Sequence, residues 1–188
     1  MVVKNGDEYQ DENLLVCPTV NQDLLAASYL RFKQEGLLDY LYYENQPTLI
    51  DYFKVMLAPG SICLAAFRIE QYLPNKPVTL TGLAHLQPPV GIGGGYQKSD
   101  MQFAFYREFQ DGVWTRSAAK LMLDWTFDRT TLESVWGYTS VNNRAMVRFA
   151  KSLGYRQVVL ESYSTWKGEL CDVVCSSMTR KAWESLSI

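Results

Sequence analysis

The stretch SVNNRAMVRFAKSLGYRQV, residues 140–158, decides how this sequence folds. Asn142 and Asn143 stand where a helix is expected to begin, and Gly154 can adopt the left-handed conformation that ends one. Tyr155 then anchors the return of the chain into a strand. Between these limits the apolar residues recur at the spacing of a single helical face. They are Ala145, Met146, Phe149, Ala150 and Leu153.

The flanking sequence completes a strand, helix and strand unit. Residues 117–127 place apolar side chains on one helical face, residues 134–139 read as a strand, and residues 157–163 read as the strand after the helix. The strand expected at 101–107, the helix 117–127 and the strand 134–139 form a unit that requires a right-handed crossover between near-parallel strands.

The first half of the chain predicts helices followed by an antiparallel meander. Helical spacing covers residues 24–32, 37–43 and 48–57, and Pro59-Gly60 ends it. Strands are expected at 62–68, 78–86 and 101–107, with the turn-rich segment 73–77 and the loop 88–99 between them. A last strand covers 171–178, and a polar tail covers 180–188. We expect one domain over residues 1–188, with residues 1–13 as a loose N-terminal segment.

Composition excludes several function classes. Eighteen basic and 20 acidic side chains give a formal charge of −2, so no broad positive field is available for nucleic acid or an anionic membrane. The longest apolar runs, such as residues 62–67, are far shorter than a membrane span, and the N-terminus is acidic and polar. We therefore expect a cytoplasmic protein with no nucleic-acid or membrane partner.

Cysteine and histidine are too sparse for a disulfide framework or a metal centre. Cys17, Cys63, Cys171 and Cys175 lack any metal-binding spacing, and His85 is the single histidine of the chain. Buried free cysteines and a half-buried histidine in an apolar strand are expected, and no metal site.

From Asn142 onward the sequence resembles a known family. The order Asn142, Arg144-Ala145, Phe149 and Leu153-Gly154-Tyr155 is similar to the second half of the GCN5-related N-acetyltransferase (GNAT) fold. The ending from Asp172 to Trp183, with its Thr-Arg-x-x-Trp tail, is similar to the subgroup that acetylates N-terminal amines of ribosomal proteins. The resemblance covers about residues 100–183 and is only architectural before that.

The resemblance implies an α/β (α+β) fold. Its sheet is mixed, mostly antiparallel and twisted, with a central splayed strand pair and helices on both faces. It also implies acetyl-CoA as the co-substrate, with no metal. In the family an asparagine at the position of Asn142 binds the backbone or the pantetheine arm of acetyl-CoA, and Ala145 and Phe149 belong to the same motif. From the residues alone, Asn142 is equally explained as a helix cap, with Asn143 as the alternative cap. Where many relatives carry a tyrosine that can give a proton, this chain has Phe149; the ribosomal subgroup shares that departure.

The pyrophosphate loop departs from the family pattern. Relatives carry Gln or Arg, two residues, Gly, one residue, and Gly or Ala before a helix, whose bare amides hold two phosphates. Here residues 110–117 keep one glycine, Asp111 adds a carboxylate, and Trp114 adds bulk. The segment could still bind phosphate through its backbone and one cation, or be an ordinary helix start with a solvated arginine. The residues concerned are Gly112, Val113, Trp114, Thr115, Arg116 and Ser117.

Acetyl transfer needs a neutral amine, a donor for the developing oxyanion and a proton for the thiolate. The resemblance places the oxyanion donor in the backbone of a bulged strand, at Phe105, Tyr106 and Arg107. Asp100 and Glu108 are the candidate bases, and solvated turn charges are the alternative for each.

Several other features are ambiguous. The glycine run 91–95 precedes a strand, which favours a hairpin loop over a dinucleotide loop. Arg148 and Lys151 could meet a nucleotide phosphate or lie on a solvated helix face. Tyr40, Tyr42 and Tyr43 would line the acceptor groove or form an aromatic core.

We therefore expect an acetyl-CoA-dependent N-acetyltransferase whose acceptor is a small-molecule amine or a protein N-terminus. The alternative is an eroded acetyltransferase-like domain that serves as a binding or structural module in a larger assembly. Transfer of a larger acyl or aminoacyl group on the same fold is a third reading. The sequence leaves the oligomeric state open, a dimer included.

Overall fold

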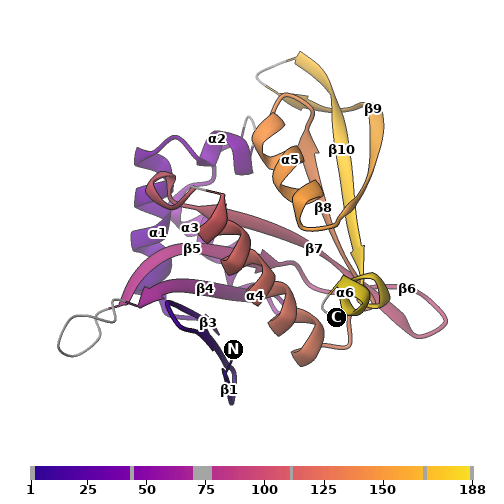
Figure 1. Ribbon diagram of the computed structural model, residues 1–188. Coiled ribbons are helices and arrows are strands. Elements are labelled where there is room, and N and C mark those ends of the chain that lie inside the picture. Colours follow the sequence, from indigo (N-terminus) through magenta and orange to yellow (C-terminus); the bar gives the residue numbers. More distant parts are fainter. Residues whose placement is uncertain (1–2, 43–44, 70–77, 111, 167–168, 187–188) are drawn as a thin grey trace.

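The computed structural model describes residues 3–42, 45–69, 78–110, 112–166 and 169–186. The helices are α1 (Gln22–Gln34), α2 (Leu38–Leu41), α3 (Leu49–Met56), the 3-10 turn η1 (Arg107–Phe109), α4 (Val113–Arg129), α5 (Arg144–Ser152) and α6 (Arg180–Leu186). The strands are β1 (Val3–Asn5), β2 (Glu8–Asp11), β3 (Leu14–Pro18), β4 (Ile62–Ile69), β5 (Val78–Leu86), β6 (Val90–Gly93), β7 (Tyr96–Phe105), β8 (Ser134–Ser140), β9 (Arg156–Trp166) and β10 (Glu169–Thr179). Figure 1 shows their arrangement.

The strands form one mixed sheet that is antiparallel except at its centre. Their order is β1-β2-β3-β4-β5-β7-β8-β10-β9, with β6 paired to β7 outside this path. The described strand pairs are antiparallel apart from β7 and β8, which run parallel because α4 carries the chain from one to the other. The expected mixed, mostly antiparallel sheet is confirmed.

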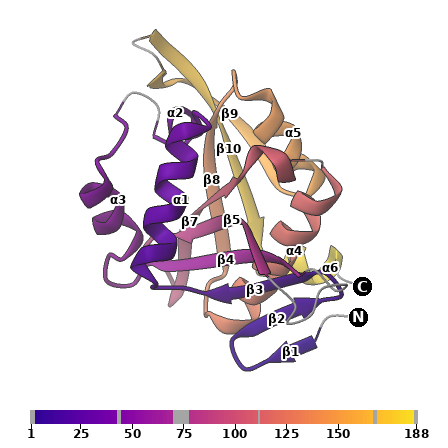
Figure 2. The same ribbon diagram turned by 90° about the vertical axis from the view of Figure 1, so that its left-hand side faces the viewer.

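Helices cover both faces of this sheet (Figure 2). On one face α1 and α3 pack on β4 and β5 through a core that includes Phe32, Tyr52 and Leu83. On the other face α4, α5 and α6 share a second core that includes Met122 and Leu153. Two apolar layers therefore hold the central strands from both sides, which fixes the position of β7 and β8.

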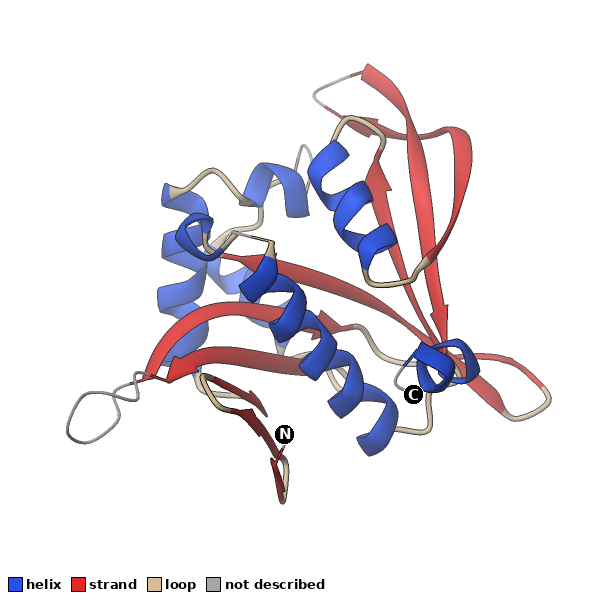
Figure 3. Cartoon of the chain, in the orientation of Figure 1, coloured by secondary structure: helices blue, strands red, loops and turns tan. Residues whose placement is uncertain are grey.

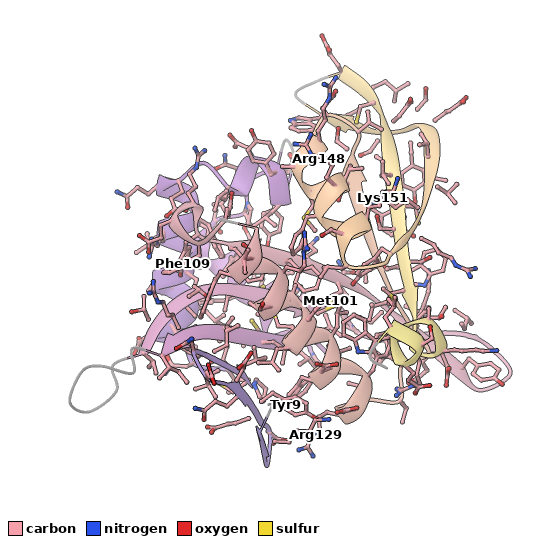
Figure 4. The ribbon with its side chains drawn as sticks, viewed as in Figure 1. Tyr9, Met101, Phe109, Arg129, Arg148 and Lys151 are labelled. Atoms are coloured by element: carbon pink, nitrogen blue, oxygen red, sulfur yellow. The ribbon has the colours of Figure 1, made fainter. Side chains whose placement is uncertain are left out.

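The N-terminal residues are more ordered than expected. Residues 3–13, which we expected to be loose, contribute β1 and β2, and Tyr9 is 1% exposed. The Tyr9 hydroxyl donates to Asp128 of α4 at 3.0 Å, the Trp125 indole donates to the Asp7 carbonyl at 2.8 Å, and Arg129 lies over the Tyr9 ring (Figure 4). These partners lie more than a hundred residues away in the chain, so no local pattern announces them.

Two further segments differ from the expectation. The loop 88–99 contains β6 and the start of β7, which form a hairpin around Gly93, Gly94 and Gly95, all at positive φ. Residues 180–186 of the polar tail form helix α6. Arg180 donates to the carbonyls of Phe127, Thr130 and Leu132, the last two at 2.8 and 2.9 Å. This one guanidinium satisfies carbonyl groups at and beyond the end of α4, which fixes the C-terminal segment against that helix. The expected turn at 73–77 lies outside the described residues.

Candidate functional site

The two central strands separate after a short parallel pairing. Lys98, Ser99 and Asp100 of β7 pair with residues 134–136 of β8, and no described residue continues the ladder beyond them. From there β7 and β8 diverge, with β7 following β5 and β8 following β10 (Figure 3). At the apex, a Cβ on Gly137 would stand 3.3 Å from the Met101 carbonyl oxygen. The expected splayed pair is therefore present.

Hydrogen bonds on either side show which backbone groups face the splay. Asp100 and Tyr106 direct their backbone toward β5, because the Asp100 carbonyl accepts from Gln87 N–H and Tyr106 N–H donates to Thr81, each at 2.9 Å. Along an antiparallel strand, the N–H and C=O groups of successive residues point alternately to the two neighbouring strands. Those of Met101, Phe103 and Phe105 therefore point toward β8.

The same alternation applies to β8. Val141 N–H donates to the Asp172 carbonyl at 3.1 Å, which continues the β10 ladder along the odd-numbered residues. The backbone of Tyr138, and the N–H of Ser140, consequently face β7. On the β7 side, the N–H groups of Phe103 and Phe105 therefore point into the gap between the two strands, where a ligand amide could meet them.

The three residues expected to donate to the oxyanion direct their backbone N–H groups to different places. Tyr106 N–H is bonded to Thr81, and Arg107 N–H donates to Glu35 Oε2 at 2.8 Å. Phe105 alone keeps its N–H directed at the splay, while its carbonyl accepts from the Gln110 amide at 2.6 Å. The expected bulge also lies elsewhere: β7 pairs regularly with β5, and the register shift falls on β5, where Thr81 is the extra residue opposite β4.

Phe103 is a candidate site residue that the sequence reasoning missed. Its backbone faces the splay, and its ring stacks beside that of Phe105, with centroids 6.3 Å apart. Phe149 of α5 meets both rings edge-on at 6.2 and 6.4 Å. The alternation of buried aromatic residues along 101–105 is the signal that could have pointed to it. Phe149 packs here as part of the apolar wall, and its ring has no proton to give.

The start of α4 can offer backbone N–H groups to an anion, although only one glycine precedes the helix. Gly112 is its N-cap residue at φ +83°, and no side chain within the described residues caps it. The first amides, of Val113, Trp114 and Thr115, therefore have no intrahelical acceptor. Val113, Arg116 and Ser117 are exposed, whereas Thr115 is buried and its hydroxyl donates to the Phe109 carbonyl at 2.6 Å.

The large side chain at this position points toward the protein core. Trp114 is partly buried and packs against both cores, with the Arg68 guanidinium 6.0 Å from its ring centroid. Its indole therefore does not cover the helix end. Asp111, the residue expected to oppose phosphate, lies outside the described residues.

The two asparagines at α5 divide the roles that the sequence left open. Asn143 is the cap, because its side-chain oxygen accepts from Met146 N–H at 3.2 Å. Asn142 keeps an exposed side chain beside the splay, while its N–H donates to the Ser140 hydroxyl at 3.2 Å. Ala145 is exposed on the first turn of α5. Capping by Asn143 leaves the Asn142 amide available for a ligand.

The two candidate bases lie in different surroundings. Asp100 is the last paired residue before the splay, and burial raises the pKa of its carboxyl group while Lys98 opposes that shift. Glu108 lies on η1 and forms an ion pair with Arg31 of α1 at 2.7 Å. Arg31 also pairs with Glu35 at 2.9 Å, so Glu108 belongs to a charge network that ties η1 to α1. Asp100 is the one of the two that borders the splay.

Aromatic side chains line the α1–α3 side of the splay. Tyr40 of α2 meets Trp166 of β9 edge-on at 5.6 Å, and Tyr138 stacks on Tyr163 at 5.9 Å with nearly parallel rings. Tyr42 is partly buried, and Tyr43 lies outside the described residues. The first contact connects α2 to β9, and the second connects β8 to β9.

Cationic and metal-binding residues are limited. Arg148 and Lys151 both project from α5, above Met101 of β7 (Figure 4), and both are exposed. No group of three or more His, Cys, Asp or Glu side chains in the described ranges could hold a metal ion. Among the same residues, no helix is long and apolar enough to cross a membrane.

Comparison with solved structures places this architecture among acetyltransferases. Spermidine N-acetyltransferase from Vibrio cholerae, solved with CoA and spermine, matches with a TM-score of 0.73 and 15% identity over 93% of this chain and 99% of that one. Ribosomal-protein-S5-alanine acetyltransferase from Vibrio fischeri matches with a TM-score of 0.69 and 13% identity over 94% and 98%. A protein from Chromobacterium violaceum assigned to the GNAT family matches with a TM-score of 0.71 and 14% identity over 96% and 90%.

This chain therefore has the GNAT acetyltransferase fold. No family model and no curated protein matches its sequence. At these sequence identities the likeness is one of fold. The activity and the acceptor depend on the residues of the site.

Proposed function

We propose that this chain is an acetyl-CoA-dependent N-acetyltransferase that acts on an amine. The observation that supports this most directly is the splay, where β7 and β8 pair over three residues and then separate. Backbone groups exposed between two buried strands are costly unless a partner satisfies them. A ligand that carries its own amides along a narrow arm is the kind of partner that fits.

The residues present fit acetyl-CoA in two places. Phe105 and the Asn142 amide lie where the pantetheine arm would pass, with Ala145 and Phe149 on the neighbouring helix face. The backbone N–H groups at the start of α4, from Gly112 to Thr115, together with the Ser117 hydroxyl and the Arg116 guanidinium, would hold the pyrophosphate. Acetyl-CoA supplies an acetyl group activated as a thioester.

The chain's own residues supply positioning and proton transfer. Phe105 N–H can donate a hydrogen bond to a carbonyl oxygen placed between the strands. Asp100, partly buried with a raised pKa, can accept a proton from an ammonium group that approaches from the α1–α3 side. Phe149 serves as a wall.

Two acceptor classes follow from the structural neighbours. One neighbour is a spermidine N-acetyltransferase, another is a ribosomal-protein-S5-alanine acetyltransferase, and a third is a ribosomal L7/L12 alpha-N-protein acetyltransferase. We propose that the acceptor here is one of these, a small-molecule amine or a protein N-terminus. We also propose a single domain in the cytoplasm, where its four free cysteines would stay reduced.

The second candidate is a binding or structural module that has lost its cofactor. The single glycine before α4 and the phenylalanine at 149 favour it, because both remove features that relatives use. The two candidates differ in whether the protein binds acetyl-CoA at all.

Thermal unfolding with and without millimolar acetyl-CoA separates them. A ligand at a hundred times its Kd adds about 2.7 kcal/mol of stability, so a rise in Tm of several degrees is expected. Free thiol released in the presence of spermidine, or of a peptide beginning with alanine, then measures transfer. If neither Tm nor thiol release changes, the binding-module reading replaces the enzyme.

A further inference from the structure

A small cavity lies on the α1–α3 face, close to the splay. Its volume is about 20 Å³, and it is lined by residues from β5, β7 and the segments of α1, α2 and α3. Tyr52 and His85 line it with exposed fractions of 1% and 4%. Within the described residues, the Tyr52 hydroxyl and both ring nitrogens of His85 make no hydrogen bond. The remaining lining residues are Phe32, Leu41, Tyr42, Met56, Leu83, Gln102 and Ala104.

Polar groups buried this deeply require a partner. An unsatisfied buried donor or acceptor destabilises the fold by about 1–3 kcal/mol, and native proteins fill such places with ordered water. A cavity of this size has room for one water molecule, which needs at least two polar partners. Tyr52 and His85 supply them.

The His85 ring is neutral in this setting. Burial lowers its pKa to about 4, although the Val55 carbonyl of α3 lies near the ring and favours the protonated form without meeting hydrogen-bond geometry. The titratable groups around the ring are Cys63, Tyr42 and Tyr52, each uncharged at neutral pH because burial raises its pKa. A neutral imidazole has one N–H and one acceptor nitrogen, so with its N–H toward Val55 the acceptor can face the cavity.

Strand register connects this cavity to the splay. His85 stands directly opposite Gln102 in the β5–β7 ladder, so the two side chains share a face and lie within reach of one another. Gln102 lies two residues beyond Asp100, where the pairing of β7 with β8 has ended, and its side chain is partly exposed. Gln102 lines the cavity and is partly exposed, so its amide can be reached both from the cavity and from solvent.

We propose that one bound water bridges Tyr52 and His85, and that this network holds the Gln102 amide as a contact for the acceptor. Gln102 is then a specificity residue, and His85 and Tyr52 are positioning residues behind it. The acceptor part rests on the proposed acetyltransferase function; the water site does not.

The single histidine makes the water site directly measurable. In protein labelled at histidine, the NMR signals of the ring should show one neutral tautomer down to about pH 5, and a rotating-frame Overhauser experiment should detect a long-lived water at the ring. A ring that titrates near pH 6.5, as an exposed histidine does, would overturn the proposal. So would the absence of a bound water.

Amine binding tests the role of Gln102. Calorimetry on CoA-saturated protein, with spermidine and with an alanine-initiated peptide as probes, should show affinity about tenfold weaker in Gln102→Ala. His85→Phe and Tyr52→Phe should weaken it similarly, with CoA affinity unchanged in all three. Gln97→Ala, on the same strand before the splay, is the matched control and should bind like the parent.

The outcomes separate the two proposals. If the parent protein does not bind CoA, that result counts against the acetyltransferase function. The NMR result still decides the water site. Equal amine affinity in Gln102→Ala and parent, or no binding of either probe by a parent that binds CoA, would overturn the acceptor role.

Discussion

Adjacent residues of one type have separate tasks at the start of α5. Asn143 holds the first turn through Met146 N–H, while Asn142 presents an exposed amide beside the splay. The pattern Asn-Asn does not distinguish them, since either could cap the helix. The backbone conformation of the turn after Ser140 does, because it brings only the Asn143 side chain over the helix end.

Paired alanine substitutions should divide these roles. Asn143→Ala should lower the free energy of unfolding by about 1 kcal/mol and leave acetyl-CoA affinity unchanged. Asn142→Ala should weaken acetyl-CoA binding by about 1–3 kcal/mol with little change in stability. Calorimetric titration beside a denaturant melt measures both quantities. Unaltered affinity in Asn142→Ala would remove that residue from the site.

Asp100 and Glu108 offer a second contrast of like residues. Asp100→Asn should reduce acetyl transfer by roughly 10²–10⁴-fold with normal acetyl-CoA affinity, because a general base is lost. Glu108→Gln loses a surface ion pair and should keep most of its rate. Initial rates of thiol release compare the two. Comparable rates in both variants would exclude Asp100 as the base.

Asp100 also predicts a pH effect on stability. Burial raises its pKa, so the folded protein binds this proton more tightly than the unfolded chain. Its contribution to stability is therefore present at low pH and is lost as pH rises through the folded pKa. Asp100→Asn should lack that decline, and melts across the range just above the usual aspartate pKa measure the difference. A parent and variant with parallel pH profiles would contradict the raised pKa.

At the scale of elements, α4 connects the pieces of the site. It begins at an uncapped glycine that exposes backbone donors, and it carries the chain between the parallel strands β7 and β8. Its N-terminal dipole favours an anion, and one cation, Arg116, lies on its first turn. The negative charge of Asp111, just before Gly112 in the sequence, would oppose the attraction of the helix dipole and of Arg116 for an anion.

Removal of that carboxylate should strengthen cofactor binding. Asp111→Gly should tighten acetyl-CoA by on the order of 1 kcal/mol through reduced repulsion across partly solvated space. Asp111→Asn, which keeps the backbone restraint, isolates the effect of charge. Glu184→Gln on the exposed face of α6 controls for net charge alone. If all three variants bind as the parent does, the α4 start does not hold the pyrophosphate.

At the scale of the whole molecule, both ends of the chain attach to α4. The N-terminal strands bind Asp128 and Trp125, while the C-terminal helix binds the far end through Arg180 and donates from the Trp183 indole to Asp124 at 2.9 Å. The Thr-Arg-x-x-Trp tail is thus a structural clamp. It stabilises the helix that positions the site without touching the splay.

Loss of the clamp should reduce stability without altering the site chemistry. Arg180→Ala should lower the free energy of unfolding by about 2–3 kcal/mol, since several buried carbonyls lose their donor. Lys181→Ala, the exposed neighbour, should change it by less than about 0.5 kcal/mol. Urea denaturation compares them. A similar loss in both would show that the tail contributes only general helix propensity.

The local sequence pattern was sufficient to predict the elements that are amphipathic and that carry their own end signal. The helix over 144–152, its Gly154 end at φ +92°, and the strands around it follow from spacing and one glycine. A splayed central pair was expected from the resemblance, and the structure shows that the pairing ends at Asp100 and Trp136. The helix and its end depend on residues within a few turns of one another, whereas the splay joins two strands that are distant in sequence.

Tertiary structure alone decided what depends on distant partners. Residues 3–11 are held by contacts to α4, Tyr106 and Arg107 are withdrawn from the splay by Thr81 and Glu35, and Glu108 is engaged by Arg31. Which amide of a strand faces a gap is set by register with its neighbour, and register is a long-range property. The sequence by itself therefore determined the elements and the general place of the site, whereas the pairing of strands determined which backbone groups remain for a ligand.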